Sequence, residues 1–159
     1  MDTKILREFE LFKGFPPREL NALAGIFSTQ TLSAGESIIT QGDKSEGVYL
    51  LLHGTIAVKR ETRSGALVPI CNIDPGSLFG TISTIDGGAR GAHCVAKTDV
   101  EYGFLQTVDF LDLIAGNSAM ALGFQVVIIR SIFRDIRFTN EQLAEYSSLA
   151  PIEELTPLS

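Results

Sequence analysis

The sequence offers little from which to build a metal centre or a disulfide framework. Its 159 residues include two cysteines and two histidines. Cys71 and Cys94 lie in apolar surroundings, so we expect them to be small core residues rather than disulfide partners or nucleophiles. His53 precedes a turn glycine, and His93 is the immediate neighbour of Cys94 on a predicted strand. Because adjacent strand residues point to opposite faces, we predict neither a metal site nor a haem site.

Positive charge is also scarce. Lysine and arginine number 13 against 19 acidic residues, which gives a formal net charge of -6 at pH 7. An acidic chain gains little from the counterion release that favours DNA binding. The sequence contains no recognisable Cys/His finger and no evident helix-turn-helix. We therefore expect no nucleic-acid binding by this chain.

Long uninterrupted apolar runs are absent as well. The N-terminal segment, MDTKILREFELF, lacks the apolar region of a signal peptide. The most apolar stretch, residues 119–136, contains four polar or charged residues: Gln125, Arg130, Arg134 and Asp135. Such a stretch does not predict a membrane span, and we expect a cytoplasmic protein. Because no nucleophile–base pair and no paired carboxylates are recognisable, we also expect no enzymatic activity.

Glycine and short apolar runs, in contrast, are abundant. A hydrophobic content of 45% is enough for a buried core, and the length predicts one domain. Fifteen glycines suggest many tight turns. Six apolar or alternating runs predict strands: residues 37–40, 47–52, 55–59, 67–73, 93–96 and 102–105. Short strands at regular spacing predict a mainly β sandwich or jelly roll.

Helical patterns flank this β region on both sides. Near the N-terminus, three apolar residues lie at helical spacing: Ile5, Phe9 and Phe12. Pro16-Pro17 can open a second helix, and Asp109 is expected to cap a short helix that ends at Leu113. The single domain predicted for residues 1–150 therefore has three parts: N-terminal helices at 1–28, a β-roll at 29–107 and C-terminal helices at 108–149. A short tail is expected at 151–159.

The last predicted helix is long and carries a second periodicity. We expect Ser118 to cap a helix that runs to about Leu149. Seven of its residues follow an alternating spacing of four and three: Leu122, Val126, Ile129, Phe133, Ile136, Asn140 and Leu143. This is a heptad seam, which favours a homodimer formed through the helix. The alternative is a helix that packs only on its own barrel.

One loop carries a pattern suited to an anion. Gly80 permits an unusual dihedral or a close approach of the backbone, and residues 81–85 can form a helical turn. The N–H groups at the start of a helix favour an anion. Arg90 follows beside two small residues, Gly91 and Ala92, and its guanidinium suits a phosphate. The alternative is a surface loop with a solvated arginine.

Four segments, in this order and spacing, resemble a known family. They are residues 34–43 (AGESIITQGD), 48–58 (VYLLLHGTIAV), 79–96 (from Phe-Gly through Arg90 to Ala96) and 138–143 (FTNEQL). Together they resemble the cyclic-nucleotide-binding domain of the catabolite-activator type, over roughly residues 8–147.

The resemblance implies an eight-stranded β-roll, or double-stranded β-helix, flanked by helices. It implies that a cyclic nucleotide, cAMP or cGMP, lies inside the roll beneath the long helix, and no other cofactor is implied. Arg90 would bind the phosphate with help from backbone amides near Ser83 and Thr84, and Thr139 and Asn140 align with base-contacting positions. The expected binding residues are Phe79, Gly80, Thr81, Ile82, Ser83, Thr84, Arg90, Gly91, Ala92, Thr139 and Asn140.

Thr81 departs from the family pattern. The family usually carries a glutamate directly after Phe-Gly, and that glutamate accepts a hydrogen bond from the ribose 2′-hydroxyl. A charge-assisted hydrogen bond contributes about 1.5–3 kcal/mol, so its loss would weaken binding roughly 10- to 100-fold. Thr84 and Gly91 are also unusual, because an apolar residue and alanine or serine are common there. The phosphate half of the site looks retained and the ribose half altered.

Three functions fit these observations. We favour a small-molecule sensor that signals through its long helix or to an output partner protein. The second is a degenerate β-roll that no longer binds nucleotide and acts as a dimerisation or interaction scaffold. The third is the sensor part of a transcription regulator, because the sequence ends where the family's DNA-binding part would begin.

Overall fold

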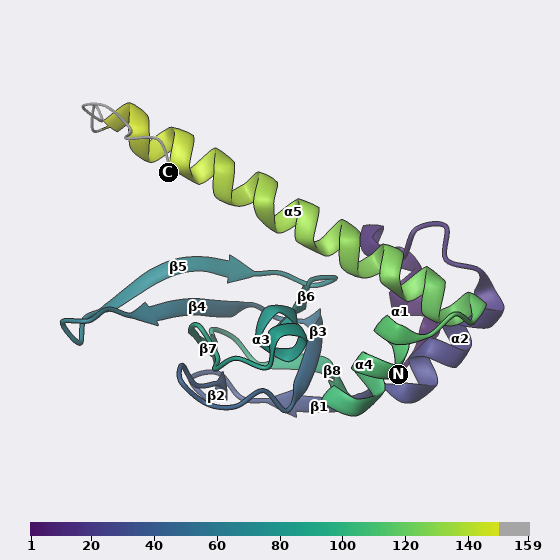
Figure 1. Ribbon diagram of the computed structural model, residues 1–159. Coiled ribbons are helices and arrows are strands. Elements are labelled where there is room, and N and C mark those ends of the chain that lie inside the picture. Colours follow the sequence, from purple (N-terminus) through teal and green to yellow (C-terminus); the bar gives the residue numbers. More distant parts are fainter. Residues whose placement is uncertain (150–159) are drawn as a thin grey trace.

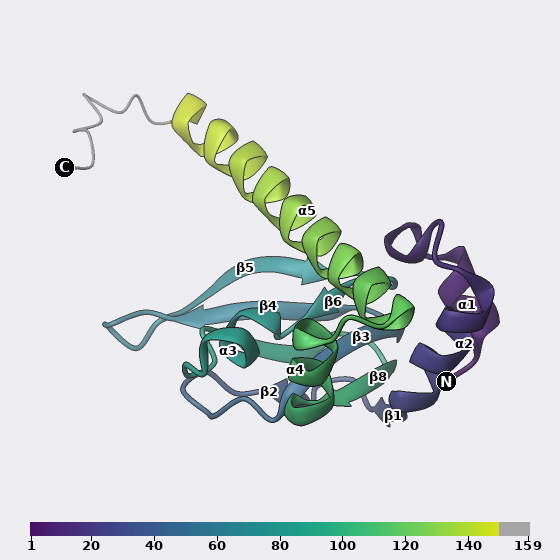
Figure 2. The ribbon, with the colours of Figure 1, turned by 45° about the vertical axis from the view of Figure 1, so that its right-hand side comes forward.

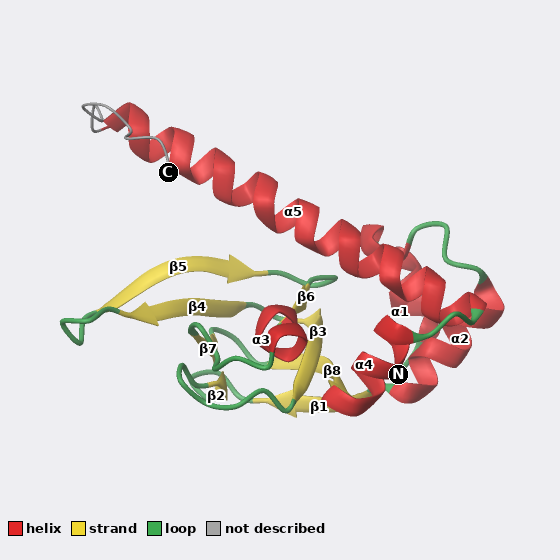
Figure 3. Ribbon diagram, in the orientation of Figure 1, coloured by secondary structure: helices red, strands yellow, loops and turns green. Residues whose placement is uncertain are grey.

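The computed structural model describes residues 1–149 as a β-roll with helices packed against one end (Figure 1 and Figure 3). One four-stranded sheet has the order β1-β8-β3-β6 and the other β2-β7-β4-β5, with every pairing antiparallel. The first sheet consists of β1 (Ser28–Leu32), β8 (Val100–Gln106), β3 (Gly47–His53) and β6 (Leu78–Phe79). The second consists of β2 (Ser37–Ile39), β7 (His93–Ala96), β4 (Ile56–Glu61) and β5 (Leu67–Ile73). The prediction of a mainly β roll with flanking helices is confirmed.

Strand β3 lies between two hydrophobic cores. Val48, Leu50 and Leu52 pack into the core shared with the helices. Tyr49 and Leu51 point the other way, into the interior of the roll. Successive side chains of a strand alternate between faces, so a strand buried on both faces needs an unbroken apolar run. This is why residues 48–52 contain no charged residue.

The helices form a layer against the first sheet. They are α1 (Thr3–Glu8), the 3-10 turn η1 (Glu10–Phe12), α2 (Pro17–Ile26), α4 (Thr107–Ala115) and α5 (Ala119–Leu149), while the short α3 (Thr81–Asp86) belongs to the roll. Phe110 of α4 and Phe124 of α5 meet edge to face, with ring centroids 6.0 Å apart. Ser118 Oγ accepts from the Ala121 N–H, which confirms the predicted start of the long helix. The C-terminal half of α5 runs away from the helical layer (Figures 1 and 2).

Several predicted element boundaries are wrong. The first helix does not continue to Phe12, because Phe9 adopts extended angles and packs against Gly76. Strands β1 and β6 were not predicted: β1 is largely exposed and lacks an apolar pattern, and β6 has only two residues. Helix α4 begins at Thr107, directly after β8, so Asp109 lies in its first turn instead of capping it. The predicted tail lies outside the described residues.

In the described part of the chain, no single helix is both long and apolar enough to span a bilayer. The pair formed by α4 and α5 has the length and composition, but the two helices bend by 102° where they meet.

Candidate functional site

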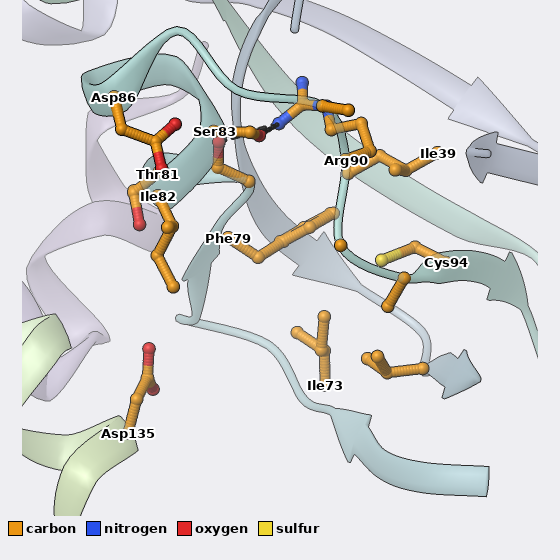
Figure 4. A pocket seen from close by; sticks show the side chains of 15 residues that line it. Ile39, Ile73, Phe79, Thr81, Ile82, Ser83, Asp86, Arg90, Cys94 and Asp135 are labelled. Carbon is orange, nitrogen blue, oxygen red and sulfur yellow. Dashed lines mark hydrogen bonds between the residues drawn. The ribbon is translucent and has the colours of Figure 1, made fainter. Parts of the chain in front are cut away.

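A cavity of about 320 Å³ opens between the interior of the roll and the short helix α3 (Figure 4). Its wall is contributed by β2, β4, β5 and β7, by the segment from Phe79 to Ala92, and by one residue of α5. The lining residues are Ile39, Val58, Ile73, Phe79, Gly80, Thr81, Ile82, Ser83, Asp86, Ala89, Arg90, Gly91, Ala92, Cys94 and Asp135. The cavity therefore has a largely apolar interior with charged groups at a few places.

Helix α3 is bounded by two glycines, which let the chain turn sharply at each end of it. Gly80 has φ +77°, and a Cβ at this position would lie 2.7 Å from Arg90 Nη1. Gly87 has φ +69° and ends the helix. L-residues with a side chain rarely adopt such angles, so glycine is required at both ends. The single helical turn predicted from the sequence is confirmed, and the backbone N–H groups of its first turn have no partner within the helix.

Arg90 is held rigidly at one end of the cavity. Its side chain is nearly inaccessible, with 5% exposure. Nη1 donates to Gly80 O at 2.7 Å and to Ser83 Oγ at 2.9 Å, and Nη2 donates to Gly47 O at 2.7 Å. The guanidinium also lies over the Tyr49 ring, 5.5 Å from its centroid. The alternative of a solvated surface arginine is therefore excluded.

Arg90 forms no ion pair with the residues that the structure describes: none of their carboxylate oxygens lies within 4.0 Å of its nitrogens. Its three hydrogen bonds go to neutral oxygens and use three of the five guanidinium N–H groups. Buried charges in proteins are normally paired. Arg90 is therefore the candidate anion-binding group of this site.

The inner wall of the cavity is apolar. Ile39, Val58, Ile73 and Phe79 surround Cys94, and burial raises the pKa of the Cys94 thiol to about 12. At neutral pH this thiol is protonated and behaves as a small apolar group. In the described residues, no cluster of three or more histidine, cysteine, aspartate or glutamate side chains has a geometry that would hold a metal ion. This wall suits the flat apolar faces of an organic ligand.

The mouth of the cavity carries two carboxylates. Asp86 lies at the end of α3, and Asp135 lies on α5 across the cavity from Arg90 and Ser83 (Figure 4). The Asp135 side chain is exposed on one side, yet desolvation at the cavity mouth raises its pKa, and the neighbouring Arg134 acts in the opposite direction. The cavity lining thus carries one cation, Arg90, and two carboxylates, Asp86 and Asp135.

The structure brings most of the predicted binding residues together. Eight of them line the cavity: Phe79, Gly80, Thr81, Ile82, Ser83, Arg90, Gly91 and Ala92. Thr84 is buried but does not line the cavity, and its hydroxyl is placed to donate to Gly80 O or Gly47 O. Thr139 and Asn140 are exposed on α5 and do not line the cavity. That they contact the base of a ligand stays a prediction.

Asp135 and Tyr49 were missed as site residues. Thr139 Oγ1 donates to Asp135 O at 2.9 Å, which shows that Asp135 lies one helical turn before the predicted pair on the same side of α5. The spacing of four residues was therefore the signal available in the sequence. Tyr49 belongs to the buried run of β3, where nothing in the local sequence separates a core aromatic residue from one beneath a guanidinium.

Residues 29–117 match the family model described as "Cyclic nucleotide-binding domain". The chain belongs to this family. The match includes α3, Arg90 and every lining residue of the cavity except Asp135 on α5.

Similar proteins are regulators of two kinds. The "Cyclic AMP receptor protein" of Thermus thermophilus is 30% identical over 122 residues, which is 77% of this chain and 56% of that protein. The "cAMP-dependent protein kinase regulatory subunit" of Aspergillus niger is 31% identical over 101 residues, 64% of this chain and 24% of that protein. A solved cyclic nucleotide-binding domain from Methylobacillus flagellatus has a TM-score of 0.76 at 20% identity and covers 99% of this chain and 84% of its own. The chain thus spans about half the length of the first relative and a quarter of the second.

Proposed function

We propose that this chain is a sensor domain that binds a cyclic nucleotide, cAMP or cGMP, with the phosphate on Arg90. The observation that carries the proposal is the buried guanidinium in the wall of a largely apolar cavity, with no carboxylate partner among residues 1–149. A volume of about 320 Å³ lies at the small end of ligand sites in proteins, which begin near 300 Å³. The printed names of the first two relatives include cyclic AMP and cAMP, which supports this class of ligand.

The geometry supports one orientation of the ligand. An anionic group at Arg90 also lies within reach of Ser83 Oγ, whose oxygen accepts from Arg90 and whose proton remains available. The apolar wall around Phe79 and Cys94 then contacts the uncharged part of the ligand. The ribose faces Thr81, which is 7% exposed and carries a neutral hydroxyl. Phosphate recognition is therefore strong in this proposal, and ribose recognition is weak.

The first test is direct titration of the purified chain with cAMP and with cGMP by isothermal calorimetry. We expect saturable binding at one site per chain to at least one of them. Ligand at 100 times Kd should add about 2.7 kcal/mol to the free energy of unfolding and raise the melting temperature. The matching control is adenosine, which lacks phosphate and should not bind comparably. Absence of heat with both nucleotides would favour the scaffold function, which the neutral Thr81 motivates.

A second prediction concerns the ribose side of the site. Thr81→Glu restores the carboxylate that is typical of the family and should strengthen cAMP binding roughly 10- to 100-fold, since a charge-assisted hydrogen bond contributes about 1.5–3 kcal/mol. Thr81→Gln is the neutral control of similar size and should gain much less. The gain must disappear with 2′-deoxy-cAMP, because the donor hydroxyl is then missing. An equal gain with both ligands would contradict this assignment of Thr81.

Output is proposed to pass through α5, either to a homodimer partner or to another protein. Helix α5 has apolar residues on the side that faces away from the core, of which Leu122, Ile129 and Phe133 are each more than half exposed. A second copy of the same helix can cover this face. The single domain at 1–150 and the location in the cytoplasm stay predictions.

A further inference from the structure

Three hydroxyl-bearing residues, Thr84, Ser45 and Thr107, are joined by hydrogen bonds between α3 and the start of α4. Thr84 Oγ1 and Ser45 Oγ are 2.6 Å apart. Thr107 Oγ1 donates to Ser45 O at 3.5 Å, and the Thr107 N–H donates to Glu46 O at 3.0 Å. Thr84 belongs to α3 and Thr107 begins α4. The segment of residues 45–47 is therefore attached to both helices.

Thr84 and Arg90 share the same two acceptors. Thr84 Oγ1 lies 2.8 Å from Gly80 O and 3.1 Å from Gly47 O. Arg90 donates to each of these carbonyls at 2.7 Å. A hydroxyl has one proton and can donate to only one carbonyl at a time, whereas the guanidinium serves both together. Which of the two carbonyls Arg90 bonds therefore determines the carbonyl to which the Thr84 hydroxyl must donate.

A bound phosphate would change which groups donate to Gly47 O and Gly80 O. It competes for the N–H groups of Arg90 more strongly than a neutral carbonyl does, because its hydrogen bonds are charge-assisted. The phosphate can bind the two free N–H groups of Arg90, and any turn of Nη2 toward it weakens the bond to Gly47 O, a buried carbonyl that also lies 3.5 Å from Ser45 Oγ. The Thr84 hydroxyl can then take Gly47 O in its place, since it already lies 3.1 Å away. This reorientation also changes its bond to Ser45.

The segment at Gly47 has little freedom to absorb such a change. Gly47 is buried, and its Cα packs directly against the backbone of Leu105 on β8, with no room for a side chain. A shift there acts on the next residues along β8, which lead directly into α4 at Thr107. Helix α4 in turn is fastened to α5, because Gln125 Nε2 of α5 lies 3.2, 3.0 and 2.8 Å from three carbonyl oxygens at the C-terminal end of α4: Leu113 O, Ile114 O and Gly116 O.

We propose that Thr84 is a positioning residue whose hydroxyl, with Ser45 and Thr107, couples occupancy of Arg90 by a ligand phosphate to α4 and so to α5. The proposal rests on the proposed binding of a cyclic nucleotide at Arg90. It assigns a role to the threonine at a position where the family commonly has an apolar residue. Thr84 contacts the hydroxyl of Ser45 and Thr107 bonds to the carbonyl of the same residue, so Ser45 joins the two, and the two alternative acceptors of Thr84 provide its two states.

The experiment compares Thr84→Val, which removes the hydroxyl at nearly constant volume, with Thr84→Ser, which keeps it. Thr31→Val on the exposed strand β1 is the matched control. Calorimetry measures the cAMP affinity, and hydrogen–deuterium exchange measures α4 amides with and without saturating cAMP. We expect cAMP to change α4 exchange by about 2- to 30-fold in the wild type, in Thr84→Ser and in the control. In Thr84→Val, this ligand effect should be lost even at cAMP concentrations that calorimetry shows to saturate the variant, whatever its affinity.

Thr107→Val provides a second route if Thr84→Val does not fold. This variant lacks only the Thr107 hydroxyl at the start of α4. The cAMP affinity should therefore be unchanged, and the effect of cAMP on α4 amide exchange should fall. A full α4 response in either valine variant, or its loss in Thr84→Ser, would overturn the proposal. If the wild type binds cAMP without any change in α4 exchange, the proposed coupling is wrong and the proposed binding function still stands. If the wild type does not bind cAMP or cGMP at all, the proposed function fails instead.

Discussion

Replacing Arg90 with alanine is expected to lower the affinity for a cyclic nucleotide roughly 100- to 10,000-fold. Two guanidinium N–H groups remain for the phosphate after the three protein bonds are counted, and each charge-assisted bond contributes about 1.5–3 kcal/mol. The loss should be the same for cAMP and cGMP, because the two share the cyclic phosphate. Calorimetric titration of both nucleotides against the variant and the wild type measures it.

Two controls separate this effect from general damage. Arg90→Lys keeps the charge but not the planar fork, so its affinity should lie between those of the wild type and the alanine variant. Arg63→Ala removes an exposed arginine from the turn between β4 and β5 and should bind like the wild type. Circular dichroism and thermal melting show whether each variant is folded. A folded Arg90→Ala that binds within tenfold of the wild type would contradict the role of Arg90.

The segment from Phe79 to Ala92 was predictable because its structure is local. Gly80 and Gly87 adopt positive φ angles, which glycine permits, so breaks at both ends of a helical turn could be anticipated from the sequence. The arginine with small neighbours is likewise contiguous in the sequence. The burial of Arg90 beneath carbonyls was not predictable, because Gly47 lies 43 positions away along the chain and joins it through the pairing of the strands. The absence of a counter-charge is a property of the folded site alone.

The apolar wall of the cavity and Asp135 could not be predicted from the sequence, because their placement depends on tertiary structure. Ile39, Val58, Ile73 and Cys94 come from four strands, and which of their neighbours face inward depends on the strand register. The β2–β7 and β4–β5 pairings both contain an irregularity, and a shift by one residue exchanges the two faces of a strand. Asp135 depended on the direction that α5 takes away from the roll. A pattern of helical spacing shows which residues share a face but not where along the helix that face meets the cavity.

Helix α5 presents two apolar faces, and within residues 1–149 only one of them is packed against other elements. Ala121, Phe124, Val127 and Ile128 are buried in the helical core, and Ser131 continues that face. The predicted heptad seam lies on the opposite side, where Phe133 is 59% exposed. The seam side chains are exposed and do not pack on the chain's own barrel, so the alternative considered from the sequence is wrong. An exposed apolar seam of this length is typical of a helix that pairs with a second helix.

Phe133→Glu is therefore expected to convert a homodimer into a monomer. Each apolar seam residue contributes about 1.5–3 kcal/mol when buried, and a homodimer loses two such residues and gains two unpaired charges, so the dissociation constant should rise at least about 100-fold. Analytical ultracentrifugation across a range of protein concentrations measures the change. Gln142→Glu is the matched control, because nine residues place it on the opposite side of α5, and it should remain dimeric. A wild type that sediments as a monomer at every concentration, or a dimeric Phe133→Glu, would show that this seam is not a dimer interface.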